Sequence, residues 1–407
     1  MKICFFTENY YKGGLDTFLI NLINAWPDVN DQLTLVCNGT HAGLDTITEK
    51  TNRPLEIKRY YRLFTSAIAQ GHSTLSWGQS FPVRAFFGLA RRFLQYPILF
   101  PWYIFTLMFF FRRNDYDRLM VVNGGYPASL LGRSAVIAWG FAGKKSHAIL
   151  NIHSIAIISP SYAKFFEDLI DQWVIRFSGH VVSVSKVCLN SLSKRTAFLA
   201  CSKLSYIHNG IEDPAIYIRS NFEKVHTQSK EQYCLMLATY HSYKGHFYLL
   251  QAFKSVLEDF PNVRLKIHGH GLPEEKKQVA DEIVRLKLEN EVSLGDFMPQ
   301  TAALLAGASV LVVPSQAYES FGLTIIEAMA FGVPVVTTDV GGMPEVLGDS
   351  KAGYVCSKDD PLEFSAGIKK ILGDSTLALE LGRNGRISFD RRFSANVMAE
   401  AYRKLIK

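Results

Sequence analysis

The stretch that says most about the fold of this 407-residue chain is Val310-Leu-Val-Val-Pro-Ser-Gln-Ala-Tyr-Glu319-Ser-Phe-Gly-Leu-Thr-Ile-Ile-Glu327-Ala-Met-Ala-Phe-Gly-Val-Pro-Val-Val336. Val310–Val313 and Val333–Val336 are near-continuous apolar runs, which is typical of strands buried on both faces of a parallel sheet. Gly322–Phe331, between them, has the pattern of a helix. Two parallel strands joined by a helix form the repeating unit of α/β folds.

The same alternation extends in both directions along the chain. In the first half, strands are predicted at Lys2–Phe6, Leu33–Cys37, Leu119–Val122, Ala148–Ile152 and Val181–Val184, with helices at Leu15–Trp26, Pro127–Phe141 and Tyr162–Phe177. In the second half, strands are predicted at Tyr233–Leu237, Val263–His268, Val292–Leu294, Val335–Thr337 and Gly353–Cys356, with helices at Gly245–Phe260, Pro273–Leu286 and Pro361–Leu372. The pattern therefore predicts two Rossmann-like, doubly wound α/β domains.

A chain of this length is too long for a single hydrophobic core, so two domains are expected. We place an N-terminal domain at 1–205 and a C-terminal domain at 206–390, with the polar stretch Glu212–Glu231 as the linker. The segment 391–407 ends in a predicted helix, about Ala395–Lys407, that could return to the first domain. Ligands of doubly wound folds bind outside the carboxyl ends of the strands, so motifs there deserve the greatest weight.

Composition excludes several classes of protein. Hydrophobic content of 48% with 20% charged residues indicates a packed globular protein rather than a disordered one. The six cysteines are scattered without a Cys-x-x-Cys pair, which argues against a disulfide framework or a zinc site and favours a reducing cytoplasm. No signal peptide precedes the first predicted strand, so we expect a cytoplasmic protein.

Two carboxylates accompany the predicted helix start at Gly322. Glu319 lies in the loop before the helix, and Glu327 lies inside it. Unpaired backbone amides and the positive end of the helix dipole favour an anion such as a diphosphate at this point. Carboxylates do not bind phosphate, but they accept hydrogen bonds from the hydroxyl groups of a sugar. Taken alone, such a pair is more often an ordinary loop residue and an ordinary helix residue.

The passage from Glu319 onward, with Val340-Gly-Gly-Met-Pro-Glu345 after it, closely resembles the Glu-x7-Glu region of family-four glycosyltransferases. Those are retaining enzymes of the GT-B type, in which two Rossmann-like domains face each other across a cleft. The resemblance implies that Glu319 holds the sugar hydroxyls of a nucleotide-sugar donor and that Glu327 holds its ribose. It also implies that Phe321, Gly322 and Leu323 contribute to donor binding.

Tyr240-His-Ser-Tyr-Lys244-Gly245 resembles the donor-phosphate motif of the same family, in which a lysine before a glycine binds the diphosphate. A lysine ammonium is a compact charge that suits this role. The sequence departs from the family at Thr239, where an arginine is usual. One phosphate-binding charge is therefore missing, so either another cation replaces it or the donor binds more weakly.

Other matches to the family are weaker singly. Gly13-Gly14 resembles its glycine pair beside the donor phosphate, although a plain turn is an equal alternative by pattern alone. The turn at Gly269 resembles its Gly-x-Gly turn under the nucleotide. His153 matches the family histidine that faces the 6-hydroxyl region of the sugar, although a histidine at a strand end is more often structural. We therefore name Glu319, His153 and Lys244 as candidate catalytic residues.

Metal and cofactor chemistry is not expected. Asp115-Tyr-Asp117 has the metal-binding Asp-x-Asp form of another glycosyltransferase fold, but it precedes a first-domain strand and lies far in sequence from the donor motifs. In GT-B enzymes a lysine and helix dipoles stabilise the leaving diphosphate. The chain also lacks a Gly-x4-Gly-Lys-[Ser/Thr] loop and a serine hydrolase motif, which disfavours kinases, ATPases and hydrolases.

The segment about 58–113 is basic and aromatic. Between Glu56 and Asp115 it carries eight Lys or Arg residues and no acid, so the rest of the +7 chain is close to neutral, at −1. Phe93–Phe111 is a 19-residue run without charge, bracketed by Arg91-Arg92 and Arg112-Arg113. Crossing a bilayer would split one domain between two compartments, so we expect peripheral contact with an anionic membrane rather than with nucleic acid. A helix packed on its own domain is the alternative.

The resemblance implies retaining transfer of a hexosyl unit from a UDP or GDP sugar to a glycan or lipid-linked acceptor, in the synthesis of a surface polysaccharide or glycolipid. Two rivals stay open. One is another enzyme on the same fold, an epimerase or a phosphorylase, of which a phosphorylase would need pyridoxal phosphate. The other is a nucleotide-sugar-binding partner without activity of its own, for which Thr239 is the argument.

Overall fold

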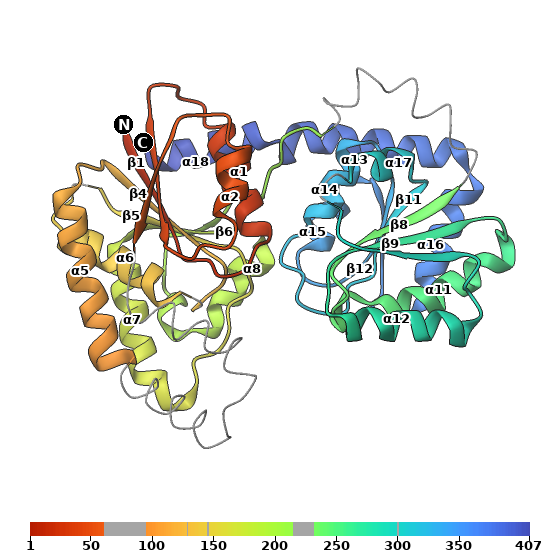
Figure 1. The fold of residues 1–407 in the computed structure, drawn as a ribbon, viewed down its shortest axis with the longest axis horizontal. Helices are drawn as coiled ribbons and strands as arrows, with labels where there is room; N and C mark the ends of the chain where they lie inside the picture. Colours follow the sequence, from red (N-terminus) through yellow and green to blue (C-terminus); the bar gives the residue numbers. More distant parts are fainter. Residues whose placement is uncertain (61–94, 128, 145, 215–231, 299–300) are drawn as a thin grey trace. The chain divides into compact units, whose positions relative to one another are not determined.

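The computed structural model of the chain describes residues 1–60, 95–127, 129–144, 146–214, 232–298 and 301–407 (Figure 1). It contains two compact units: unit 1 is Met1–Ile207 with Ala399–Lys407, and unit 2 is His208–Met398. The first change of unit, after Ile207, lies beside the predicted boundary at 205/206. The second lies inside the last helix, α18 (Ala395–Ile406), and not before it at 390/391. Most of the predicted linker, 215–231, lies outside the described residues.

Unit 1 is built on a seven-stranded parallel sheet with the order β3-β2-β1-β4-β5-β6-β7. Its strands are β1 (Lys2–Thr7), β2 (Gln32–Asn38), β3 (Leu55–Tyr60), β4 (Arg118–Asn123), β5 (Ala148–Ile152), β6 (Ser178–Ser183) and β7 (Leu204–Tyr206). Every residue of β1 after Lys2 is buried. A strand buried in this way needs apolar residues at successive positions, which explains the continuous runs in the sequence.

The helices of unit 1 connect these strands. They are α1 (Gly14–Asn24), α2 (Leu44–Lys50), η1 (Gln95–Leu99), α5 (Phe100–Arg113), α6 (Leu130–Phe141), η2 (Ser161–Ala163), α7 (Lys164–Phe177), α8 (Lys186–Ser191), η3 (Leu192–Lys194) and η4 (Thr196–Phe198). The end of α18 is tied to the same unit. Asn151 donates a hydrogen bond to the Tyr402 hydroxyl at 2.6 Å, and Arg118 Nε donates to the Ile406 carbonyl at 2.6 Å.

Unit 2 has a six-stranded parallel sheet with the order β10-β9-β8-β11-β12-β13. Its strands are β8 (Tyr233–Leu237), β9 (Arg264–His268), β10 (Val292–Gly295), β11 (Val310–Val313), β12 (Val335–Thr338) and β13 (Gly353–Cys356). Its helices are η5 (Ser242–Lys244), α11 (His246–Asp259), α12 (Pro273–Leu286), α13 (Ala302–Gly307), α14 (Leu323–Ala330), α15 (Met343–Leu347), η6 (Gly348–Ser350), α16 (Pro361–Gly373), α17 (Ser375–Ser388) and η7 (Phe389–Phe393).

In both units the strand order reverses beside the first strand. The chain adds strands on one side of β1 as far as β3 and then continues on the other side from β4, and unit 2 repeats this around β8 and β11. Such a reversal marks the point where ligands bind in doubly wound sheets, outside the carboxyl ends of the strands. The predicted α/β class with two doubly wound parallel sheets is confirmed.

Some predicted elements differ in extent. Strands β3 and β7 were not predicted, because they are edge strands whose residues are mostly half-buried and do not form an apolar run. Strand β6 begins three residues before the predicted Val181. Helix α6 begins at Leu130 rather than Pro127, because the Ser129 hydroxyl caps it by accepting a hydrogen bond from the Gly132 amide.

Helix α5 lies in the predicted basic and aromatic segment, of which 61–94 is outside the described residues. Phe100, Tyr103, Leu107 and Phe111 are buried in the core of unit 1. The other face of the helix, with the turn before it, exposes large apolar side chains: Ile98, Trp102, Phe105 and Phe109. Among the described residues, none of the helices is both long enough and apolar enough to cross a membrane.

Candidate functional site

The carboxyl ends of β8 and β11 bring two predicted site residues together in unit 2. The loop after β8 carries Lys244, and the loop after β11 carries Glu319. Lys244 Nζ lies 2.7 Å from Glu319 Oε2, and the two side chains are 20% and 16% exposed. An ion pair of this kind at the reversal point of the sheet supplies one cation and one hydrogen-bond acceptor within reach of a single ligand.

Two tyrosines flank this ion pair, and the sequence analysis did not single them out. Lys244 Nζ lies 5.6 Å from the centre of the Tyr243 ring, which meets the Tyr318 ring edge-on at 5.9 Å. Tyr318 is 75% exposed, and its φ of 59° is uncommon for a residue other than glycine. The signal for them in the sequence is that each tyrosine directly precedes a predicted site residue, Lys244 or Glu319.

Glycines allow the loops around the ion pair to meet backbone to backbone. Gly341, with a φ of 61°, lies so close to the loop of Glu319 that an added Cβ would be 1.8 Å from the Glu319 carbonyl oxygen. The next residue, Gly342, donates its amide hydrogen bond to that same carbonyl at 2.9 Å. Gly245, after Lys244, lies equally close to the loop that follows β11. An added Cβ on Gly245 would be 1.9 Å from the Pro314 carbonyl oxygen.

Gly341→Ala is expected to destabilise unit 2 by about 2 kcal/mol or more, because it combines left-handed backbone strain with a clash against the backbone. Thermal unfolding followed by circular dichroism would measure the change. Gly348→Ala is the matched control, since Gly348 has helical backbone angles and its added Cβ would meet no atom within 4 Å. Equal melting temperatures for the two variants would show that Gly341 does not hold the loop of Glu319.

Helix α14 begins at Leu323, four residues after Glu319. Gly322 is its N-cap, with a φ of 97° that favours glycine, and Leu323 is its first residue. Phe321 is buried at 2% exposure, so it anchors the turn between Glu319 and the helix. The backbone amides of this first turn and the dipole of the helix can receive an anion.

Glu327 is the fifth residue of α14. Burial raises the pKa of its carboxyl to about 7, so this group changes charge near neutral pH. A half-buried carboxyl in the second turn of a helix at the reversal point can accept hydrogen bonds from ligand hydroxyl groups when it is ionised. Its position agrees with the predicted helix, which begins one residue later than expected.

Thr239 and Gly269 lie where strands β8 and β9 end. An added Cβ on Gly269 would be 1.6 Å from the Ala238 carbonyl oxygen, so only glycine allows the two loops to come this close. The Thr239 hydroxyl is buried and has no hydrogen-bond partner in the part of the chain that the structure describes. A ligand atom could satisfy this hydroxyl, but it cannot supply the positive charge of the arginine that is usual in the resembling family.

The remaining predicted residues lie in unit 1. Gly13 is the N-cap of α1 and donates its amide hydrogen bond to Asp16 at 2.9 Å, and Gly14 is the first residue of that helix. His153 follows β5, and its ring meets the Phe18 ring edge-on at 4.3 Å. His153 Nε2 is buried without a partner among the described residues, and burial lowers its pKa to about 3. This neutral imidazole is therefore able to exchange a hydrogen bond with an uncharged ligand group.

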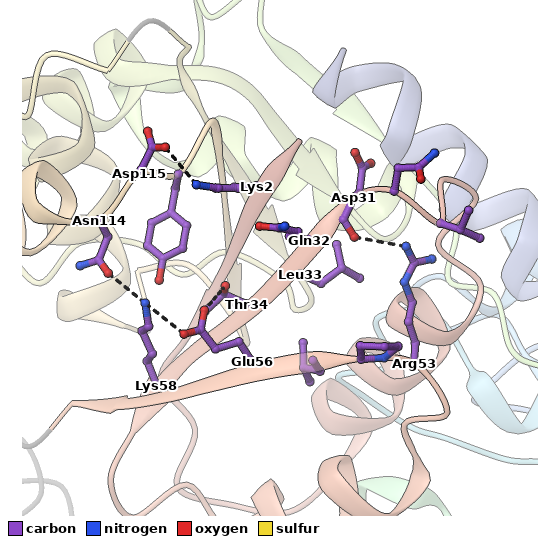
Figure 2. Close-up of a pocket in the computed structure, with 15 residues that line it drawn as sticks. Lys2, Asp31, Gln32, Leu33, Thr34, Arg53, Glu56, Lys58, Asn114 and Asp115 are labelled. Atoms are coloured by element: carbon purple, nitrogen blue, oxygen red, sulfur yellow. Dashed lines mark hydrogen bonds and ion pairs between the residues drawn. The ribbon is translucent and has the colours of Figure 1, made fainter.

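The Asp115/Asp117 pair has structural partners. Lys2 Nζ lies 3.0 Å from Asp115, and the Lys2 amide donates to Asp117 at 2.7 Å. Both aspartates lie at the amino end of β4, and the described residues contain no cluster of His, Cys, Asp or Glu able to hold a metal ion. Figure 2 shows a pocket of about 850 Å³ in this part of unit 1. Within it, Lys58 donates a hydrogen bond to Asn114 and forms an ion pair with Glu56. The pocket contains none of the predicted site residues, and those of unit 1 follow the carboxyl ends of β1 and β5.

Comparisons with known proteins agree with this arrangement. Residues 218–388 match the family of group 1 glycosyl transferases. The chain is 27% identical over 229 residues to the glycosyltransferase MJ1178 of Methanocaldococcus jannaschii, covering 56% of this chain and 59% of MJ1178. It is 24% identical over 294 residues to CapM, a capsular polysaccharide biosynthesis glycosyltransferase of Staphylococcus aureus, covering 70% of this chain and 75% of CapM.

The fold is shared with HepE of Anabaena, which was solved in complex with UDP. The TM-score is 0.71, with 19% sequence identity over 99% of both chains. The family match covers unit 2, where Lys244, Glu319 and Glu327 lie, and the shared fold covers both units. Residues 218–388 are therefore similar to the group 1 glycosyl transferases, and the chain as a whole has the GT-B fold.

Proposed function

We propose that this chain is a retaining glycosyltransferase that moves a hexosyl unit from a nucleotide-diphosphate sugar to a hydroxyl group of a glycan or lipid-linked acceptor. The observation that carries the proposal is the Lys244–Glu319 pair, 2.7 Å apart, beside the N-terminus of α14 at the reversal point of the unit 2 sheet. A cation and helix amides suit a diphosphate, and a neighbouring carboxylate suits a sugar.

In the proposed reaction the bond between the sugar C1 and the donor phosphate oxygen breaks, and a bond from the acceptor oxygen to C1 forms on the same face. The acceptor proton passes to an oxygen of the leaving diphosphate, so no protein nucleophile is needed. Lys244 would exchange its bond to Glu319 for one to the diphosphate, which gathers negative charge as it leaves. Glu319 would then accept hydrogen bonds from the sugar hydroxyls, and Glu327 from the ribose.

The relatives support the donor and acceptor classes. HepE was solved with UDP, and CapM is named for capsular polysaccharide biosynthesis. A UDP or GDP sugar is therefore the first donor to test, with a polysaccharide or glycolipid precursor as the acceptor. His153, with its partnerless Nε2, would bind a hydroxyl of the transferred sugar, and Gly13 and Gly14 would face the donor phosphate.

A thermal-shift screen of UDP and GDP sugars tests the proposal first, followed by turnover assays with the donors that bind. The anomeric configuration of the product, read by NMR, tests retention. Activity should persist in excess EDTA, since Lys244 and the helix amides replace a divalent metal in this proposal. Binding without turnover would instead favour the non-catalytic partner, and isomerisation of the free donor would favour an epimerase.

The donor affinity is expected to depend on pH through Glu327. Its pKa of about 7 means that the carboxylate form, which accepts hydrogen bonds from the ribose, is lost as the pH falls. The donor KM at pH 6 should therefore be roughly five- to tenfold higher than at pH 8. Glu327→Gln should abolish this dependence, and a dependence unchanged in that variant would assign it to another group.

The same variant gives a control on stability. Burial opposes ionisation, so Glu327 reduces the stability of the fold progressively as the pH rises from 4.5, its ordinary pKa, towards 7. Glu327→Gln should therefore melt at a higher temperature than the wild type at pH 8 and at a similar temperature at pH 4.

We also propose that unit 1 contacts an anionic membrane through α5, which would bring the enzyme to a lipid-linked acceptor. Ile98, Trp102 and Phe105 are 56%, 54% and 52% exposed, at spacings that place them along one side of the helix. Arg112 and Arg113 stand at its C-terminal end. An apolar, aromatic stripe with arginines at its end matches the boundary between acyl chains and anionic headgroups.

Wild-type protein is expected to sediment with anionic vesicles and less with neutral ones, with partial release at high salt because only the electrostatic attraction is screened. Changing Arg91, Arg92, Arg112 and Arg113 to Glu should reduce sedimentation, and Trp102→Ala with Phe105→Ala should leave a salt-sensitive remainder. Lys254→Glu with Arg383→Glu, at two exposed sites of unit 2, is the control for the same net-charge change as Arg112→Glu with Arg113→Glu. Failure of the wild type to sediment with either lipid would rule the membrane contact out.

A further inference from the structure

His208 is the first residue of unit 2, and its imidazole lies among side chains that surround the donor loop 319–322. Its ring centre is 5.6 Å from that of Phe321 and 5.6 Å from that of Phe393. The two phenylalanine rings meet edge-on at 5.9 Å, and both are buried. Phe321 is one of the two residues between Glu319 and the N-cap of α14, so the His208 ring packs directly on the turn that sets the position of both.

The imidazole also has a charged partner. His208 Nε2 lies 2.7 Å from Glu345 Oε1, and the two side chains are only 15% and 12% exposed. Glu345 belongs to α15, whose backbone at Glu345 accepts a further hydrogen bond from Arg392 at 3.3 Å. A hydrogen bond between two groups this well shielded from water has a fixed length and direction, so it can fix the position of His208 relative to α15.

Helix α15 also contacts the donor loop directly, through its N-cap. Gly342 is the N-cap of α15, and its amide donates to the Glu319 carbonyl at 2.9 Å. Gly341, just before it, lies so close that an added Cβ would be 1.8 Å from the same carbonyl oxygen. His208 therefore reaches the backbone of Glu319 in two ways: through the Phe321 ring, and through Glu345, α15 and Gly342.

We infer that His208 is a positioning residue, which holds Glu319 and the first amides of α14 in the arrangement that binds the donor. The inference deepens the proposed function and rests on it for its effect on catalysis. His208 acts through Phe321, on which its ring packs, and through Glu345, which its Nε2 contacts. Its loss moves the turn that carries Glu319 and leaves the core of unit 2 in place.

Three variants separate positioning from general packing. His208→Phe keeps an aromatic ring against Phe321 and Phe393 but loses the hydrogen bond to Glu345. His208→Gln can restore a donor near the position of Nε2 without the ring. Glu345→Gln keeps the size of the acidic partner but removes its charge. Asp259→Asn, which breaks the 2.6 Å ion pair with Lys369 between α11 and α16, is the matched control far from the loop in sequence and contact.

His208→Phe is expected to raise the donor KM roughly tenfold, with a smaller change in kcat and a melting temperature close to that of the wild type. His208→Gln should recover most of the loss, Glu345→Gln should reproduce part of it, and Asp259→Asn should have no effect. Unchanged kinetics in His208→Phe would overturn the inference. So would a large drop in melting temperature that His208→Gln fails to repair, because that result assigns His208 a packing role.

Hydrogen exchange tests the inference without any substrate. In the ligand-free protein, His208→Phe should increase exchange in peptides covering 316–327, and His208→Gln and Asp259→Asn should not. Unchanged exchange in His208→Phe would overturn the positioning role even if the enzyme is active. Failure of the proposed function has a different signature, which is the absence of binding or turnover in the wild type while the loop still responds to the His208 variants.

Discussion

Glu319→Ala is expected to lower the rate of sugar transfer by about 10²-fold or more while leaving the fold intact. A hydrogen bond between a carboxylate and the sugar that strengthens in the transition state contributes about 3 kcal/mol, which corresponds to this factor. The fold should survive because Lys244, left without its partner, remains 20% exposed and can be hydrated. Turnover with saturating donor and acceptor measures the effect.

The lysine gives this prediction a second test. With Glu319 removed, Lys244 is free of its ion pair, so binding of the nucleotide diphosphate alone should be unchanged or tighter even as transfer is lost. Glu274→Ala, an exposed carboxylate at the start of α12, is the control for removing one negative charge from unit 2. Near-wild-type turnover in Glu319→Ala would take this residue out of the site.

Glu167→Ala is expected to destabilise unit 1 by about 3–5 kcal/mol, because it leaves buried charges without a partner. The Glu167 carboxylate is 2% exposed and lies 2.8 Å from Arg133 and 2.5 Å from Arg195. It also accepts a hydrogen bond from the Tyr96 hydroxyl at 2.8 Å. Removing this carboxylate takes away a negative charge that neutralises both guanidinium groups. Arg195 keeps its second ion pair, with Asp171 at 2.7 Å.

Tryptophan fluorescence in urea measures this effect in unit 1 alone, because all five tryptophans of the chain precede Ile207. Asp168→Ala is the matched control on the same helix, α7. Asp168 pairs with Lys164 at 2.8 Å, but the lysine is 57% exposed, so the loss should be at most about 0.5 kcal/mol. A similar unfolding midpoint for the two variants would show that the buried network does not stabilise unit 1.

The sequence by itself was sufficient to predict the strands that are buried on both faces. Strands such as β1 and β11 are buried on both faces, and burial of this kind requires an apolar residue at every position, which is a local and visible pattern. The motifs around Lys244 and Glu319 that resemble a donor site were also visible, because a motif consists of particular residue types at fixed spacing. Edge strands β3 and β7 were missed, since half of their surface faces away from the core.

The partners of these residues were decided only by the tertiary structure. Lys244 and Glu319 are 75 positions apart, and they meet because β8 and β11 are neighbours in the sheet. His208 and Glu345 are 137 positions apart and are likewise brought together only by the tertiary fold. Glu167 and Asp168 are adjacent acids on one helix, and the local pattern does not show which of them is buried, yet Arg133 and Arg195 neutralise Glu167 in the core. Hydrophobic period and residue propensity act over a few residues, whereas the pairing of charges follows from which elements the sheet places side by side.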